Sequence, residues 1–260
     1  MGIDVIREVA LRAAKEAGAI LREGLEQARV IEYKGVKNIV TDMDRRSEEA
    51  IAALVQRELP GHSLVSEEGT RLQGDSGYRW FVDPLDGTTN YAHGYPCFSV
   101  SIGVERDGEL VYGVVYDPNL EELFTAERNA GAFLNGKRLR VSAISRLSDA
   151  LLATGFSPDV ATAEENNLDH FANFMKRAQA VRRPGSAALD LCYVAAGRFD
   201  GFWELRLSPW DVAAGSLMVT EAGGRVTDIR GQPLRLSKPQ IVASNGLLHD
   251  EMLRILAKEI

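Results

Sequence analysis

The sequence is poor in cysteine and histidine. Its 2 cysteines, Cys97 and Cys192, lie far apart and form no CxxC pair. This spacing disfavours a disulfide framework, so we expect two buried free thiols in a protein of a reducing compartment, the cytoplasm. The 4 histidines show no HExxH-type spacing, which argues against a zinc site.

Long apolar runs and long runs of one charge are also missing. No stretch approaches the roughly 20 apolar residues of a membrane span, and residues 1–24 mix acids and bases, unlike a signal or transit peptide. The net charge is −7, which makes nucleic-acid binding unlikely. We expect a cytoplasmic protein without membrane association. If its substrate is an anion, an acidic protein needs a local source of positive charge.

No linker, repeat or low-complexity segment divides the chain. The hydrophobic content of 45% and the charged content of 26% are ordinary for a globular protein. The length of 260 residues allows one or two domains. We predict a single domain over residues 1–260, with possible halves at 1–145 and 146–260.

The most informative stretch is residues 80–90, WFVDPLDGTTN. Its first three residues are apolar and predict a buried strand. Pro84 lacks a backbone N–H, so the strand is expected to end at Asp83. In the turn that follows, Asp83 and Asp86 can approach one point, with the Leu85 carbonyl between them. Such an oxygen set suits a hard cation such as Mg²⁺.

The same turn offers an anion site beside the predicted cation site. Gly87 allows close approach of a ligand to the backbone, and Thr88 supplies a hydroxyl and an N–H at the start of a helical turn. The alternative is an ordinary Asp-Pro-x-Asp-Gly turn without a ligand. Other carboxylates at strand or helix ends would favour the functional interpretation.

Two further acids occupy such positions. Glu67 follows a predicted strand over residues 62–66, and Asp211 lies in the first turn of a helix predicted to begin at Pro209. Each has a simpler explanation: adjacent glutamates are usually solvated, and acids in a first helical turn complement the helix dipole. Together with the aspartates of the central stretch, they would form an oxygen-only site for two or more Mg²⁺ ions.

Three motifs carry a resemblance to a known family. These are Glu67-Glu68, the stretch DPLDGTTN at 83–90 and WDVAAG at 210–215. In this order they resemble the inositol monophosphatase family of Mg²⁺-dependent, lithium-sensitive phosphatases, and the likeness extends from the first predicted helix to the last strand. The resemblance implies an α/β fold, a layered α-β-α-β-α sandwich of the sugar phosphatase type. It also implies two or three Mg²⁺ ions and a homodimer.

The resemblance also implies roles for individual residues. The expected metal ligands are Glu67, Asp83, the Leu85 carbonyl, Asp86 and Asp211. The expected catalytic residues are Glu67, Asp44 and Thr88, with the threonine paired to the aspartate so that a water is activated. The expected substrate contacts are Asp86, Gly87, Thr88, Ser186, Ala187 and Glu204. Lys34 is expected on the third-metal side.

The implied reaction is the attack of a metal-bound water on a phosphate monoester. Inositol monophosphate is the favoured substrate of this phosphoric monoester hydrolase. Relatives with the same metal site act on fructose 1,6-bisphosphate, 3′-phosphoadenosine compounds, NADP or histidinol phosphate. Some bacterial relatives also bind the transcription machinery. A transferase using Asp42 and Asp44 is a third alternative, which the absence of a nucleotide-binding loop disfavours.

Overall fold

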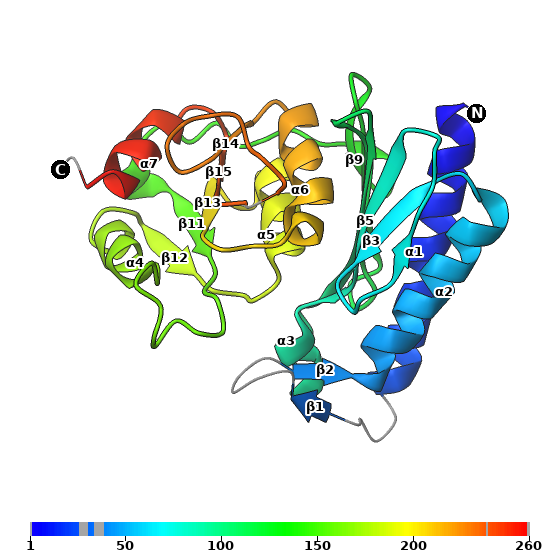
Figure 1. Ribbon diagram of the computed structural model, residues 1–260. Helices are drawn as coiled ribbons and strands as arrows, with labels where there is room; N and C mark the ends of the chain where they lie inside the picture. The colour runs from blue at the N-terminus through cyan, green and yellow to red at the C-terminus, as the bar shows by residue number, and fades with distance from the viewer. Residues whose placement is uncertain (1, 26–30, 34–38, 238, 259–260) are drawn as a thin grey trace.

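The structure, a computed structural model, consists of five alternating layers of helices and sheets (Figure 1). It describes residues 2–25, 31–33, 39–237 and 239–258. From the side of the N-terminus the layers are a helix pair, a large sheet, a second helix pair, a smaller sheet and a third helix pair. The predicted layered α-β-α-β-α sandwich is therefore confirmed.

The first two layers are formed by the N-terminal half of the chain. The outer helices are α1 (Ile3–Leu25) and α2 (Asp42–Glu58). The sheet has 8 strands in the order β10-β9-β8-β7-β6-β5-β3-β4, and only the β3–β5 pair is parallel. Its strands are β3 (Ser63–Ser66), β4 (Arg71–Leu72), β5 (Tyr78–Asp86), β6 (Ser99–Arg106), β7 (Glu109–Asp117), β8 (Glu122–Glu127), β9 (Gly131–Leu134) and β10 (Lys137–Arg138).

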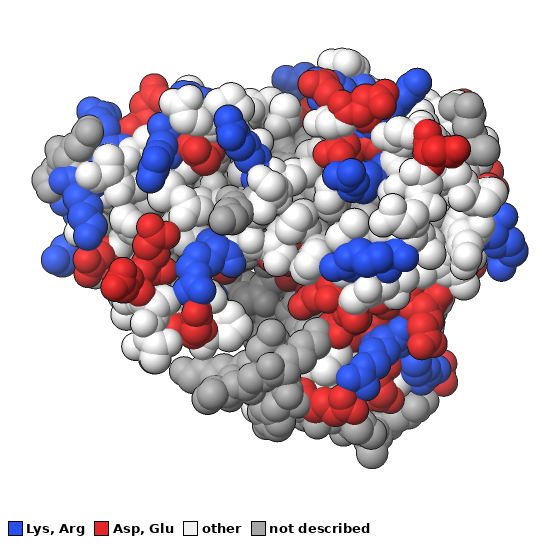
Figure 2. All heavy atoms as spheres, in the orientation of Figure 1, with Lys and Arg blue, Asp and Glu red and all other residues white. Residues whose placement is uncertain are grey.

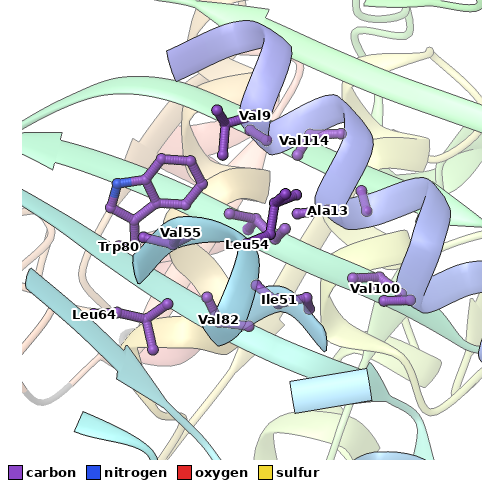
Figure 3. Packing of buried hydrophobic residues seen from close by; sticks show 14 of the residues in the cluster. Val9, Ala13, Ile51, Leu54, Val55, Leu64, Trp80, Val82, Val100 and Val114 are labelled. Carbon is purple, nitrogen blue, oxygen red and sulfur yellow. The ribbon is translucent and has the colours of Figure 1, made fainter. Parts of the chain in front are cut away.

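Periodic apolar residues attach this helix pair to the sheet. On α1 and α2 they recur every three or four residues, which gives each helix one apolar face. In Figure 3, Val9 and Ala13 of α1 and Leu54 of α2 lie over strand residues that include Trp80 and Val114. All five side chains are buried. This core fixes α2, and hence Asp44 on its first turn, relative to β5.

The middle layer consists of α5 (Ala187–Ala195) and α6 (Pro209–Glu221). Small residues allow α6 to lie very close to the large sheet. A Cβ placed on Gly103 would lie 2.5 Å from the Ala213 Cβ, and one on Gly113 would lie 3.1 Å from the Ala214 Cα. Gly103 and Gly113 are cross-strand partners, so they form a flat patch on which the helix rests.

The remaining layers come from the C-terminal half. The smaller sheet has the order β12-β11-β13-β15-β14, with β11 parallel to both of its neighbours. Its strands are β11 (Leu151–Thr154), β12 (Ala180–Arg182), β13 (Gly201–Glu204), β14 (Arg225–Thr227) and β15 (Ile241–Ser244). The outer helices are α4 (Leu168–Met175) and α7 (His249–Leu256).

Short elements complete the described chain. β1 (Ile31–Tyr33) and β2 (Ile39–Thr41) form an antiparallel pair, and the helix α3 (Thr88–Ala92) follows β5 directly. A 3-10 turn, η1, covers Leu147–Asp149. In Figure 1, α3 lies beside β2 below the large sheet. Lys34 lies outside the described residues.

One predicted boundary is wrong. β5 does not end at Asp83 but continues through Pro84 to Asp86, because a register shift between the two aspartates removes the need for a ladder N–H at the proline.

The composition-based predictions are met in part. Cys97 and Cys192 are both free and buried, as predicted. No helix in the described part of the chain is long and apolar enough to cross a membrane. On the face shown in Figure 2, acidic and basic side chains are interspersed.

The contact between α6 and the sheet yields a prediction. Gly103→Ala should lower the free energy of unfolding by about 1–3 kcal/mol, because the added methyl group would overlap Ala213. Urea unfolding of both proteins measures the change. Gly61→Ala is the control, since its Cβ would meet nothing closer than 3.5 Å. Equal stability of the Gly103 variant and the parent would contradict the close packing.

Candidate active site

Asp83 and Asp86 owe their positions to the irregular end of β5. Asp83 pairs with Ser101 and Asp86 with Ser99, and the register shift between these pairs turns the chain. The Leu85 N–H donates to Asp83 Oδ1 at 3.0 Å. Both aspartates are buried. The turn predicted after Asp83 is thus a bulge that brings both aspartates to one site.

Glu67 reaches this site through the parallel pairing of β3 with β5. Ser66 is the partner of Val82, and the Glu67 N–H donates to the Val82 carbonyl at 3.2 Å. Glu67 therefore stands level with Asp83. The turn after it contains Gly69 at a φ of 114°, a value that favours glycine.

Asp211 comes from the first turn of α6. It accepts a hydrogen bond from the Ser208 N–H at 2.7 Å and so belongs to a capping box. The Ser101 hydroxyl donates to the Trp210 carbonyl at 3.3 Å. Because Ser101 is also the cross-strand partner of Asp83, this bond fixes the start of α6 beside Asp83.

Asp86 connects β5 to the start of α5. Its Oδ2 accepts hydrogen bonds from the Ser186 hydroxyl at 2.5 Å and from the Ala188 N–H at 2.9 Å. Asn90 adds a second connection, since its side-chain amide donates to the Cys97 carbonyl at 2.7 Å and the Pro184 carbonyl at 2.9 Å. The predicted substrate contacts at 186 and 187 are thereby brought next to the motif at 83–90.

Thr88 and Asp44 form the predicted pair. The Thr88 hydroxyl lies 3.1 Å from Asp44 Oδ1 and 3.1 Å from the Leu85 carbonyl. Asp44 Oδ2 accepts from the Thr41 N–H at 2.8 Å and from the Thr41 hydroxyl at 2.5 Å. Asp44 is fully buried, and its hydrogen bond with Thr88 connects it to a residue that lines the cavity.

A cavity of about 200 Å³ lies at this site, and Asp44 is not among the residues that line it. All the predicted metal ligands and substrate contacts line it. They are Glu67, Asp83, Leu85, Asp86, Gly87, Thr88, Ser186, Ala187, Glu204 and Asp211. A larger hollow of about 820 Å³ lies between strands β3, β5, β6 and β7 of the large sheet, α6 and the segment 234–237, and none of these residues lines it. Catalysis requires suitably placed polar groups rather than a large volume, so the smaller cavity is the candidate active site.

Sequence reasoning missed several residues of the cavity wall. Arg183 and Asp190 line it, as do Gly155 and Phe156. A signal for Asp190 was present, since it is the single charged residue in the apolar segment AALDLCYVA and lies one helical turn after Ser186. The other three lie in loops and gave no periodic signal. A Cβ on Gly155 would lie 2.1 Å from the Glu204 carboxylate, so this glycine makes room for that side chain.

Burial dominates the electrostatics of the site. It raises the pKa of Asp83 well above the usual range, and the charges of Glu67, Asp86 and Asp211 raise it further. Burial likewise raises the pKa of Asp86 to about 6 and that of Asp211 to about 8. Hydrogen bonds to Ser186 and to Ser208, respectively, oppose these shifts. So many buried acids cannot all be ionised without a compensating positive charge.

Burial also raises the pKa of three acids that are not among the predicted metal ligands. Burial raises the pKa of Asp44 to about 6 against the hydrogen bonds from Thr41. It raises the pKa of Glu204 to about 8, while Arg183 lowers it and Asp86 raises it. Asp190, also buried, has its pKa raised well above the usual range, and its Oδ1 has no hydrogen-bond partner within the described residues.

The donor set of the cavity suits a hard divalent cation. Carboxylate oxygens and the Leu85 carbonyl are the ligand types that Mg²⁺ prefers. Within the described ranges no three Asp, Glu, His or Cys side chains are already grouped around one point as ligands of an ion. Asp83 and Asp211 lie close enough for each to shift the pKa of the other, and a cation between these carboxylates would offset their repulsion.

Comparisons with known proteins identify the family. The model of the inositol monophosphatase family matches residues 3–260. An inositol-1-monophosphatase from Mesorhizobium japonicum is 43% identical over 100% of this chain and 99% of that protein. The Nus factor SuhB of Pseudomonas aeruginosa is 46% identical over 91% of this chain and 90% of that protein.

A solved structure shows the same fold. The inositol monophosphatase of Anabaena (Nostoc) sp. PCC 7120 is 42% identical, with a TM-score of 0.90 over 99% of this chain and 97% of that one. The fold and the site therefore define a phosphatase. The chain belongs to the inositol monophosphatase family.

The raised pKa of Glu204 predicts a pH dependence of stability. An acid whose pKa is raised by folding stabilises the protein below its unfolded pKa, and this contribution disappears as the pH rises to the folded value of about 8. In chelator-treated protein, stability should therefore fall between about pH 6.5 and about pH 8.5. Glu204→Gln should reduce that fall by about 1–2 kcal/mol.

Urea unfolding at both pH values measures this effect. Asp211 titrates in the same window, so part of the fall should remain in the Glu204 variant. The Glu122→Gln variant is the control, because Glu122 lies outside the cavity in an ion pair with Arg198. An undiminished fall in the Glu204 variant would show that this carboxylate is not the source.

Proposed function

We propose that the protein is a Mg²⁺-dependent phosphatase that hydrolyses inositol monophosphate to inositol and phosphate. The observation that carries this proposal is the convergence of Glu67, Asp83, Asp86 and Asp211 on a cavity that Thr88 also lines. We assign these acids and the Leu85 carbonyl to two or three Mg²⁺ ions. When bound, the ions supply positive charge for the phosphate and lower the pKa of a coordinated water.

In this proposal the chain's own residues position the phosphate and move a proton. Gly87 and Thr88 contact the phosphate. Gly87 has a φ of 96°, and a Cβ there would lie 2.9 Å from the Cys97 carbonyl, so this position requires glycine. The Thr88 hydroxyl orients the attacking water, and Asp44 receives the proton through it, with Glu67 assisting. A pKa of about 6 for Asp44 suits a base that works near neutral pH.

The alcohol is proposed to bind along the cavity wall formed by the end of β13 and the start of α5. Glu204, Ser186 and Ala187 line that wall together with Asp190 and Arg183. Carboxylates there accept hydrogen bonds from hydroxyl groups, which favours a polyol over an apolar leaving group. The volume of about 200 Å³ favours a single ring over a dinucleotide such as NADP.

A second function is favoured by one comparison. The 46% identity to a Nus factor SuhB supports a bifunctional member that also binds the transcription machinery.

The free buried thiols support a cytoplasmic location. A homodimer is proposed from family membership alone, and light scattering behind size exclusion would test it.

Asp83→Asn should remove most of the activity and leave the fold intact. The loss in kcat/KM should exceed the about 10- to 100-fold that is typical of residues which only hydrogen-bond to a ligand. Asp117→Asn is the matched control, because Asp117 is buried outside the cavity and its Oδ2 has no partner in the described part of the chain. Hydrolysis of inositol phosphate by the Asp83 variant at the parent rate would refute the site.

A panel of phosphate monoesters should separate the substrate classes. With Mg²⁺, kcat/KM should be highest for inositol monophosphate and lower for fructose 1,6-bisphosphate, 3′-phosphoadenosine compounds, NADP and histidinol phosphate. Lithium should inhibit every measurable reaction. A higher value for a nucleotide would correct the substrate. Zero activity across the panel would overturn the phosphatase and favour the interaction protein.

A further inference from the structure

Glu48 is a buried carboxylate close to the active site that is not among its proposed ligands. It lies on α2 with 4% of its surface exposed. Its Oε2 accepts a hydrogen bond from the Glu68 N–H at 2.8 Å, and its Oε1 accepts one from the Thr70 N–H at 2.8 Å. Both of its oxygens therefore bind the backbone of the turn that follows Glu67.

We propose that Glu48 is a positioning residue for Glu67 and tunes the affinity of the site for Mg²⁺ through it. The inference rests on the proposed function, in which Glu67 is a metal ligand. The Glu67 N–H donates to the Val82 carbonyl, and the two bonds of Glu48 hold the N–H groups of Glu68 and Thr70, which follow Glu67 in the chain. Loss of Glu48 therefore removes two of the bonds that fix the turn next to the proposed ligand.

The helix gives Glu48 this role because of its register. Asp44 and Glu48 are one helical turn apart on α2 and lie on the same buried face. Asp44 contacts Thr88, while Glu48 holds the turn after Glu67. A single rigid helix, fixed by its core contacts to the sheet, therefore sets the separation between the proposed proton acceptor and the proposed ligand.

The simpler explanation is that Glu48 only stabilises a turn. A purely structural role predicts a lower melting temperature with unchanged affinity for the metal. The turn has further support that does not depend on Glu48, since the Arg71 guanidinium donates to the Thr70 carbonyl at 2.8 Å and also to the Ser66 carbonyl. Glu48→Ala is therefore expected to fold and to change mainly the position of Glu67.

Calorimetric titration of chelator-treated protein with Mg²⁺ tests the proposal. Glu48→Ala should raise the apparent Kd for Mg²⁺ by about 10- to 100-fold, as is typical when the partner of a metal ligand is lost. Glu48→Gln keeps one acceptor oxygen and should give a smaller rise. Glu49→Ala is the matched control, because Glu49 is the next residue on the same helix and is exposed. Its Kd should stay within about twofold of the parent.

A double-mutant cycle shows whether Glu48 acts through Glu67. In a Glu67→Ala background, adding Glu48→Ala should change the Kd by less than about twofold, because the residue being positioned is already gone. Independent effects that multiply in the double variant would overturn the proposal. So would an unchanged Kd in Glu48→Ala or, should that variant not fold, in Glu48→Gln. If instead Glu67→Ala itself binds Mg²⁺ like the parent, the proposed metal site is wrong.

Discussion

The burial of several carboxylates around one small cavity is the constraint on which the site depends. Mutual repulsion and loss of hydration both oppose ionisation, and the pKa of Asp211 reaches about 8 for this reason. Left without fixed partners, such side chains would turn toward water. The chain prevents this through backbone donors: Leu85 N–H for Asp83, Ala188 N–H for Asp86 and Ser208 N–H for Asp211. The acids are thus held in place by hydrogen bonds from the chain's own backbone.

Small residues at the contacts of α6 allow the middle helix layer to pack close to its neighbours. The glycine patch on the large sheet lets α6 approach closely. On its other side, a Cβ on Gly215 would lie 2.5 Å from the Leu191 Cβ of α5. Larger side chains at these positions would move the start of α6 away from the end of β5. The separation between Asp211 and Asp83 is therefore a consequence of packing throughout the middle layer.

Much of this arrangement could be predicted from the sequence, and the failures have physical causes. The motifs at 67–68, 83–90 and 210–215, through the family that they resemble, were sufficient for the fold and for most of the acids that line the cavity. The end of β5 was misplaced because proline lacks only the N–H that pairs neighbouring strands. At a β-bulge this N–H is not required, so the strand can continue through Pro84. Arg183 and Phe156 were missed because loop residues meet only in three dimensions. Glu48 was missed because an acid within a helix gives no local sign that its carboxylate binds the backbone of a distant turn.

Regular elements form one part of the cavity and loops form another, and this difference explains why the reaction type is easier to assign than the substrate. The acids that we assign to the metal and the phosphate lie on or next to regular elements, namely β5, the β3 end and the first turn of α6. The wall that we propose for the alcohol is formed partly by the loop at 155–158 and by the turn before α5. Loops tolerate changes in sequence that strands under a packed helix do not. We therefore expect substrate preference to change through residues such as Phe156 and Arg183, while the proposed metal and phosphate site stays constrained by the packing of the whole domain.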